Sequence, residues 1–180
     1  MFKLIVMSFQ KGYVQVYTGN GKGKTTAAIG LGIRAVGAGL KVAMVQFMKG
    51  RRYSEIDAIG MIPHFSVYQH GRDEFVSKED PERIDIDLAA EGLKHAKELI
   101  SAGKHDLVIL DEINVALDFK LIDLDEVMVM LEEKPEHVEI VLTGRYAPAE
   151  VVQIADLVTE MREIKHSYSK GVEARKGIEF

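Results

Sequence analysis

The chain has 180 residues, of which 47% are hydrophobic, with no cysteine and a formal net charge of −5. This composition predicts one globular domain over residues 1–180 with a sizeable core, and it excludes disulfides, thiolate nucleophiles and cysteine-type zinc sites. No apolar run approaches the roughly 18 residues of a membrane span, and residues 4–7 are too short for a signal-peptide core, so we expect a cytoplasmic protein without a membrane partner.

Short apolar runs recur along the chain at the spacing of a parallel sheet. They predict six strands, at residues 13–17, 41–47, 64–69, 106–110, 137–142 and 157–161. Capping signals and apolar stripes predict four helices between them, at residues 25–38, from an N-cap at Asp80 to Gly103, from an N-cap at Asp123 to residue 134, and at 147–155. This alternation indicates an α/β fold: a single-domain, doubly wound, mainly parallel sheet of about six strands, P-loop NTPase-like (RecA-like).

A glycine- and lysine-rich loop, residues 18–26, joins the first predicted strand to the first helix. Glycines let consecutive N–H groups point at phosphate oxygens, and the helix start adds unpaired N–H groups and a positive dipole. Lys24 supplies a point charge, and the Thr25 hydroxyl is a candidate Mg²⁺ ligand. The predicted phosphate site consists of Gly19, Asn20, Gly21, Lys22, Gly23, Lys24, Thr25 and Thr26. The alternative is a glycine turn that binds no ligand.

The loop departs from the common pattern G-x-x-x-x-G-K-[ST], because Thr18 stands at its first position and Lys22 adds a second lysine. Residues 1–54 carry nine Lys or Arg and no Asp or Glu, which favours an anionic ligand here. The remaining residues are strongly acidic and argue against a nucleic-acid partner. The six histidines are scattered without the spacing of metal ligands.

Two acids follow the apolar run 107–110, namely Asp111 and Glu112. We expect this strand to lie beside the first one, so that both acids face the phosphate loop and hold Mg²⁺ directly or through water. The alternative is an ordinary polar strand exit.

Other candidate contacts follow neighbouring strands at the sheet edge where ligands of open α/β folds bind. Arg145 follows the fifth strand, and the basic loop 49–53 follows the second, although a solvated loop is an equally good interpretation of the latter. The segment 68–75 mixes aromatic and charged residues and is either a substrate-covering segment or a surface loop. The composition of residues 160–180 favours a loosely ordered basic end.

The chain resembles the phosphate-loop ATP:corrinoid adenosyltransferases, also called cob(I)alamin adenosyltransferases. The resemblance covers nearly the whole chain and is more specific than a general ATPase signature. The matching motifs are residues 18–28, Val-Gln-Phe-Met-Lys-Gly at 45–50, Val-Ile-Leu-Asp-Glu-Ile at 108–113, Leu-Thr-Gly-Arg at 142–145, and in the tail residues 160–162, Lys165, His166, Gly171 and Gly-Ile-Glu-Phe at 177–180.

The resemblance implies an enzyme of the cob(I)yrinic acid a,c-diamide adenosyltransferase type, acting in adenosylcobalamin biosynthesis or salvage. Such enzymes move the 5′-deoxyadenosyl group of ATP onto the Co(I) of a reduced corrinoid, either cobalamin or a precursor, and release triphosphate. ATP lies reversed relative to most phosphate-loop proteins, with its 5′-carbon outward. A loop dense in N–H groups and lysines suits this chemistry, because negative charge builds on the departing triphosphate.

The resemblance also implies roles for individual residues. Lys24 is the main cation for the triphosphate, Thr25 and Glu112 hold Mg²⁺ with Asp111 nearby, and Arg34 and Arg145 help to place ATP. The alternative for Arg34, which lies on the first predicted helix, is a side chain that faces solvent and has no role in binding. Phe75 is the counterpart of the aromatic residues that force Co(II) into an easily reduced four-coordinate state.

Partners are implied in the same way: a homodimer, and a reduced flavoprotein as the electron donor. Residues 71–79 diverge from the aromatic pattern of the bacterial members. Only residues 1–17 precede the loop, where other members have a helix that covers the site, so we expect that cover to be missing here. The tail 161–180 is expected near the active site. Two other functions stay open from the residues alone, a phosphate-loop ATPase or kinase that cleaves the β–γ bond, and a nucleotide-binding module or corrinoid carrier without catalysis.

Overall fold

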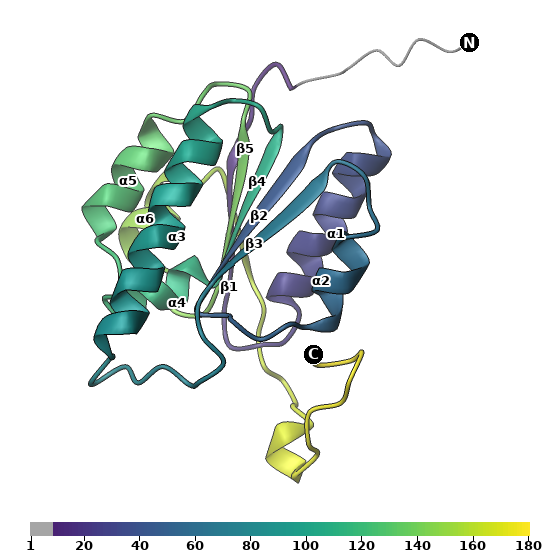
Figure 1. The fold of residues 1–180 in the computed structure, drawn as a ribbon, viewed down its shortest axis with the longest axis vertical. Coiled ribbons are helices and arrows are strands. Elements are labelled where there is room, and N and C mark those ends of the chain that lie inside the picture. The colour runs from purple at the N-terminus through teal and green to yellow at the C-terminus, as the bar shows by residue number, and fades with distance from the viewer. Residues whose placement is uncertain (1–8) are drawn as a thin grey trace.

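The computed structural model describes residues 9–180 and contains one six-stranded sheet in the order β3-β2-β4-β5-β1-β6, with every neighbouring pair parallel (Figure 1). The strands are β1 (Val14–Thr18), β2 (Val42–Phe47), β3 (Phe65–His70), β4 (Leu107–Asp111), β5 (Glu139–Thr143) and β6 (Leu157–Glu160). The apolar stretch at residues 4–7 lies outside the described part of the chain. Among the described residues, no helix is both long and apolar enough to cross a membrane.

Helices cover both faces of the sheet (Figure 1). On one face lie α1 (Lys24–Gly37) and α2 (Ser54–Ile59). On the other lie α3 (Arg83–Ser101), α4 (Ile113–Asp118), α5 (Leu124–Glu132) and α6 (Ala149–Ile154). The short 3₁₀ helix η1 (Tyr168–Lys170) belongs to the C-terminal tail. The predicted doubly wound α/β class is therefore confirmed.

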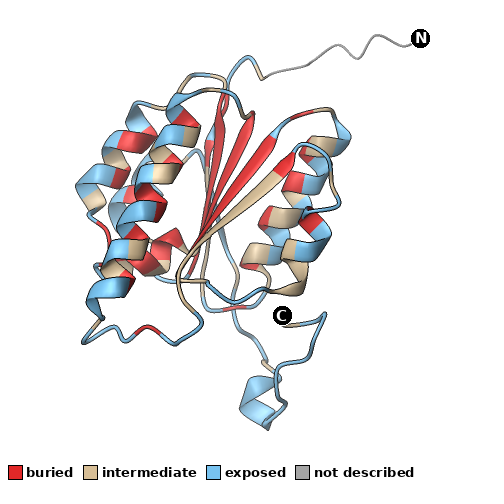
Figure 2. Cartoon of the chain, viewed as in Figure 1, coloured by how far each residue is buried: buried red, intermediate tan, exposed pale blue. Residues whose placement is uncertain are grey.

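The strands β2, β4 and β5 are buried along their whole length and form the most deeply buried part of the described chain (Figure 2). Successive side chains of one strand enter opposite cores: Leu110 packs toward α3–α6, whereas Ile109 packs toward α1 and α2. Burying one such side chain contributes about 1.5–3 kcal/mol, so the two cores together hold the carboxyl ends of the strands in fixed positions.

Three expectations need correction. The strand β4 does not lie beside β1, because β5 pairs with both and separates them. The helix α3 begins at Arg83, and its N-cap is Glu82 and not Asp80. The side chains of Glu82 and Asp85 each accept a hydrogen bond from the backbone N–H of the other residue. The helices α2 and α4 were not predicted, since six residues are too few for a clear helical periodicity.

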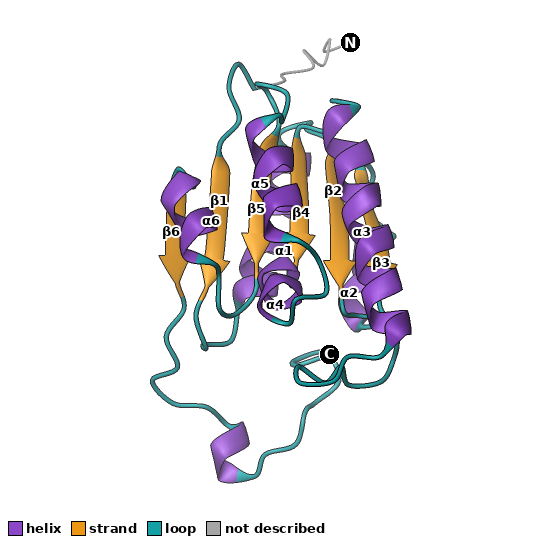
Figure 3. Ribbon diagram, turned by 90° about the vertical axis from the view of Figure 1, so that its left-hand side faces the viewer, coloured by secondary structure: helices purple, strands orange, loops and turns teal. Residues whose placement is uncertain are grey.

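Other boundaries agree with expectation. Asp123 caps α5 by accepting hydrogen bonds from the N–H groups of Asp125 and Glu126. All six strands end at one edge of the sheet, and the C-terminal tail leaves β6 there and returns beneath it (Figure 3). This edge carries the candidate site.

Candidate nucleotide and second-substrate site

The phosphate loop connects β1 to α1, and its backbone depends on two glycines. Gly19 has φ 93° and Gly23, the N-cap of α1, has φ 115°, a conformation that residues with a Cβ rarely adopt. Gly23 thereby turns the chain straight into the helix. The first turn of α1 contains no acidic residue, so nothing there opposes the attraction of its N-terminus for an anion.

Lys24 is buried and folds back over this loop. Its Nζ donates to the carbonyl oxygens of Gly19 at 2.8 Å and Gly21 at 2.7 Å. Burial lowers the pKa of Lys24 below its ordinary value, and the nearby carboxylate of Glu112 opposes that shift. The Lys24 ammonium is therefore held against the loop carbonyls and has few contacts with solvent that a phosphate would have to displace.

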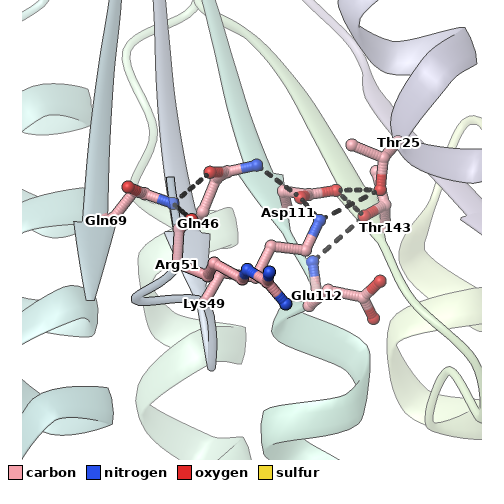
Figure 4. Close-up of polar contacts among 8 residues, drawn as sticks. All are labelled: Thr25, Gln46, Lys49, Arg51, Gln69, Asp111, Glu112 and Thr143. Atoms are coloured by element: carbon pink, nitrogen blue, oxygen red, sulfur yellow. Dashed lines mark hydrogen bonds and ion pairs between the residues drawn. The ribbon is translucent and has the colours of Figure 1, made fainter. Parts of the chain in front are cut away.

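Asp111, at the end of β4, is the centre of a buried polar network (Figure 4). Although β5 separates β4 from β1, one carboxylate oxygen accepts hydrogen bonds from the hydroxyls of Thr25 at 2.8 Å and Thr143 at 2.7 Å. The other oxygen accepts from Gln46, its register partner on β2, at 3.1 Å and from Lys49 at 2.7 Å. Four donors satisfy a carboxylate that is fully buried.

Lys49 extends this network toward the ligand cavities. Burial disfavours its charged form, but the carboxylates of Asp111 and Glu112 outweigh that effect and raise the pKa of Lys49. Gln69 on β3 continues the chain of contacts, because it donates to Gln46 Oε1 at 3.1 Å and to the carbonyl oxygen of Arg51 at 3.0 Å (Figure 4). These contacts attach Lys49 and the main chain of Arg51 to the sheet edge, while Arg51 and Arg52 stay exposed.

Glu112 is the N-cap of α4 and has a left-handed backbone, with φ 62° and ψ 15°. Its N–H donates to Thr143 Oγ1 at 3.0 Å. Burial and then the neighbouring Asp111 carboxylate raise the pKa of Glu112. Carboxylate and hydroxyl oxygens are the ligands that Mg²⁺ prefers, so Thr25 and Glu112, which line the first cavity, fit this ion. Asp111 is buried and already accepts four hydrogen bonds, so it positions Thr25 behind them.

Two cavities open at this edge of the sheet. The first, of about 630 Å³, is lined by the phosphate loop from Asn20 to Thr26 and by Ile29, Lys49, Tyr53, Ser54, Glu55, Ala58, Glu112, Arg145, His166 and residues 177–180. The second, of about 650 Å³, is lined by residues 48–51, Tyr53, residues 72–76, Lys78, Glu112, Val115, Phe119, Arg145 and Tyr146. Lys49, Tyr53, Glu112 and Arg145 line both, so the two cavities share a wall.

The structure brings most of the predicted site residues together. The loop residues from Asn20 to Thr26, with Glu112 and Arg145, line the first cavity, and Phe75, with 91% of its side chain exposed, lines the second. Gly19, Asp111 and Arg34 line neither cavity. Gly19 accepts a hydrogen bond from Lys24, and Asp111 is buried against Thr25. Arg34 lies exposed in the last turn of α1, about 15 Å along the helix from Lys24 at 1.5 Å per residue.

Sequence reasoning missed several contributors to the site. From the sequence, Lys49 fits a solvated loop as well as a ligand contact, and no pattern marks Gln46 or Gln69 as site residues. Phe119 and Tyr146 add aromatic surface to the second cavity, and Lys78 lies over both rings, at 5.8 Å and 5.6 Å from their centroids. A positive φ of 59° at Tyr146 turns the chain there, and no local pattern announces it.

A phosphate loop after the first strand of a parallel sheet, with a strand-end aspartate bonded to its threonine, defines a phosphate-loop nucleotide-binding protein. The solved KaiC-like protein PH0186 from Pyrococcus horikoshii OT3 shares this fold, with a TM-score of 0.52 and 20% identity over 84% of this chain and 74% of that one. The chain belongs to the family ATP:corrinoid adenosyltransferase BtuR/CobO/CobP, whose model matches residues 10–180. The predicted family is therefore confirmed.

Relatives named corrinoid adenosyltransferase occur in several bacteria. The Sinorhizobium sp protein is 41% identical over 95% of this chain and 81% of its own length. The Escherichia coli (strain K12) protein is 36% identical over 95% of this chain and 87% of its own length. The Salmonella typhimurium protein, called corrinoid adenosyltransferase CobA, is 34% identical with the same coverage as the E. coli protein.

Proposed function

We propose that this protein transfers the 5′-deoxyadenosyl group of ATP to the Co(I) of a reduced corrinoid and releases triphosphate. The observation that carries the proposal is the wall shared by the two cavities. A phosphate-binding cavity that adjoins a second, partly aromatic cavity suits a reaction between ATP and a large acceptor. Membership of the corrinoid adenosyltransferase family supports the same conclusion.

The reaction forms a bond from cobalt to the 5′-carbon of ATP and breaks the bond from that carbon to the triphosphate oxygen. Cobalt supplies the electron pair of the new bond, and the oxygen keeps the pair of the old one. Negative charge therefore grows on the triphosphate. The N–H groups of the phosphate loop, the N-terminus of α1 and the Lys24 ammonium stabilise that charge, and the two cavities hold the reactants in line.

Thr25 and Glu112 would hold Mg²⁺ at the head of the phosphate loop, with Asp111 behind Thr25. The ion would add positive charge beside the triphosphate oxygens. Support comes from the hydrogen bond of Thr25 to Asp111 and from the position of Glu112 on the cavity wall. Arg145, which lines both cavities, orients ATP between them.

The second cavity accepts the corrinoid in this proposal. Phe75, Phe119 and Tyr146 offer aromatic surface for a flat macrocycle, and Arg51, Arg72 and Lys78 offer donors for its polar side groups. Phe75 is the residue that disfavours an axial ligand on Co(II) and so eases its reduction. In this proposal the protein is a cytoplasmic homodimer that receives electrons from a reduced flavoprotein. Light scattering tests the dimer, and an assay coupled to a reduced flavoprotein tests the electron donor.

The decisive experiment is anaerobic incubation with ATP, Mg²⁺ and chemically reduced cob(I)alamin, with the corrinoid spectrum followed and the phosphates separated. The expected products are adenosylcobalamin and an equal amount of triphosphate. Orthophosphate or ADP without a cobalt–carbon product would contradict the proposal and indicate a phosphate-loop ATPase or kinase. ATP binding without any product would indicate a nucleotide-binding module.

A further inference from the structure

The two lysines of the phosphate loop point in different directions. Lys24 turns into the loop, as described above. Lys22 turns out of it, and its Nζ donates to the carbonyl oxygen of Ile178 at 2.9 Å and to Glu179 Oε1 at 3.0 Å. The contact joins residues 156 positions apart in the sequence. A lysine predicted to bind phosphate thus contacts the C-terminal strap, the name used here for residues 177–180.

The strap is also held from the opposite side of the first cavity. Ser54, at the start of α2, donates through its hydroxyl to the main-chain oxygen of Phe180 at 3.0 Å. The Arg51 guanidinium lies 5.3 Å from the centroid of the Phe180 ring. All four strap residues line the first cavity together with the phosphate loop. The strap therefore spans the cavity from the loop to α2.

The charge of the strap is compatible with a polyphosphate beside it. Its one acidic residue, Glu179, pairs with Lys22 and also accepts hydrogen bonds from the main-chain N–H and the guanidinium of Arg175. The Arg175 bonds, followed by that of Lys22, hold the pKa of Glu179 at about 2. Two cations thus neutralise a carboxylate that would otherwise repel the triphosphate.

We propose that Lys22 is a positioning residue that ties the C-terminal strap across the nucleotide cavity, and that the closed strap retains ATP. The proposal rests on the proposed function only in taking ATP as the occupant of the cavity. Lys22 acts on ATP through Glu179 and Ile178, not as a ligand of the triphosphate. Loosening the strap therefore weakens ATP binding and leaves the chemical step unchanged.

The test is a double-mutant cycle on the full chain with Lys22→Met and Glu179→Gln, with ATP binding measured by calorimetry in the presence of Mg²⁺. Each single change is expected to weaken ATP binding about three- to tenfold, the range of a partly exposed ion pair with an added hydrogen bond. The double variant is expected to bind ATP no more weakly than the weaker single variant, because both changes release the same strap. Fully multiplicative losses would overturn the proposal and make Lys22 a direct phosphate ligand.

Two further readouts separate positioning from a general structural defect. Hydrogen exchange at the strap should rise in both single variants, while KM for ATP rises and kcat stays near the wild-type value. Lys22→Arg should keep hydrogen exchange at the strap and KM for ATP near their wild-type values. Lys94→Met, at an exposed position on α3, should change neither of these two quantities. Unchanged strap exchange in Lys22→Met would overturn the proposal. A wild-type protein that binds ATP but forms no adenosylcobalamin would contradict the proposed function and leave the strap proposal intact.

Discussion

The Lys49 ammonium lies 2.7 Å from Asp111 Oδ2 and 3.5 Å from Thr25 Oγ1, and so contacts one of the two residues proposed to hold Mg²⁺ and the carboxylate that positions it. The side chain of Lys49 is 17% exposed and that of Asp111 is fully buried. The pair fixes the Lys49 ammonium beside the phosphate loop, at the wall shared by the two cavities. Lys49 therefore both compensates a buried carboxylate and faces the cavities.

Removal of the Lys49 charge should destabilise the fold. Lys49→Met leaves the buried Asp111 carboxylate without its cation, and breaking such a pair costs about 3–5 kcal/mol in the free energy of unfolding. Urea denaturation measures this loss. Adding Asp111→Asn should recover part of it, because the uncompensated charge is then gone, and Lys94→Met should stay within about 0.5 kcal/mol of wild type. Equal stability of Lys49→Met and wild type would mean that the pair is not formed in solution.

Lys24→Ala should remove most of the activity and preserve the fold. The Lys24 ammonium faces the loop and its ligand and not the apolar core, and loss of one preorganised group that stabilises developing charge costs about 10²- to 10³-fold in kcat. Steady-state assays with cob(I)alamin measure the effect, and circular dichroism checks the fold. Lys94→Ala is the matched control. Near-normal turnover by Lys24→Ala would contradict the assignment of the phosphate site.

Glu112→Gln should weaken the binding of Mg²⁺ and make the Mg²⁺ affinity less dependent on pH. The amide is a poorer metal ligand, so half-saturating Mg²⁺ should rise about 10- to 100-fold. Because burial and Asp111 raise the pKa of Glu112, the ionised form is lost as pH falls through a higher range than that of an ordinary glutamate. Wild-type Mg²⁺ affinity should fall in that range, and that of the variant should not. An unchanged metal titration would place the ligand elsewhere.

Phe75→Ala should separate activation of cobalt from adenosyl transfer. The side chain is 91% exposed, so its truncation should cost little stability. We expect a lower rate when the assay starts from Co(II) and a reductant, and a nearly unchanged rate with preformed Co(I). Met61→Ala, at another exposed position that lines neither cavity, is the control. Equal losses in the two assays would assign Phe75 to binding of the corrinoid as a whole.

The phosphate loop could be predicted from sequence because its residues are consecutive and its chemistry is local. The contacts of Asp111 could not, because they join α1, β2, β4 and β5 and depend on a register that places Gln46 beside Asp111. The strap is a stronger case: Lys22 and Glu179 are separated by 157 positions, and the composition of the tail favoured a loosely ordered end. Arg34 shows the converse case, since the family position implies an ATP contact while the side chain lines neither cavity, and that contact stays a prediction.

The strap should stay closed over a wide range of pH. A carboxyl whose pKa in the folded state is held at about 2, below its ordinary 4.5, contributes stability that is complete above the ordinary value and is lost as pH falls toward 2. The carboxyl carbon resonance of Glu179 should therefore not shift between pH 8 and about 4.5. In Lys22→Met the resonance should begin to shift at a higher pH, because one of the partners that stabilise the carboxylate is gone. A wild-type midpoint near the ordinary value would show that Glu179 is unpaired, and that the strap is open, in solution.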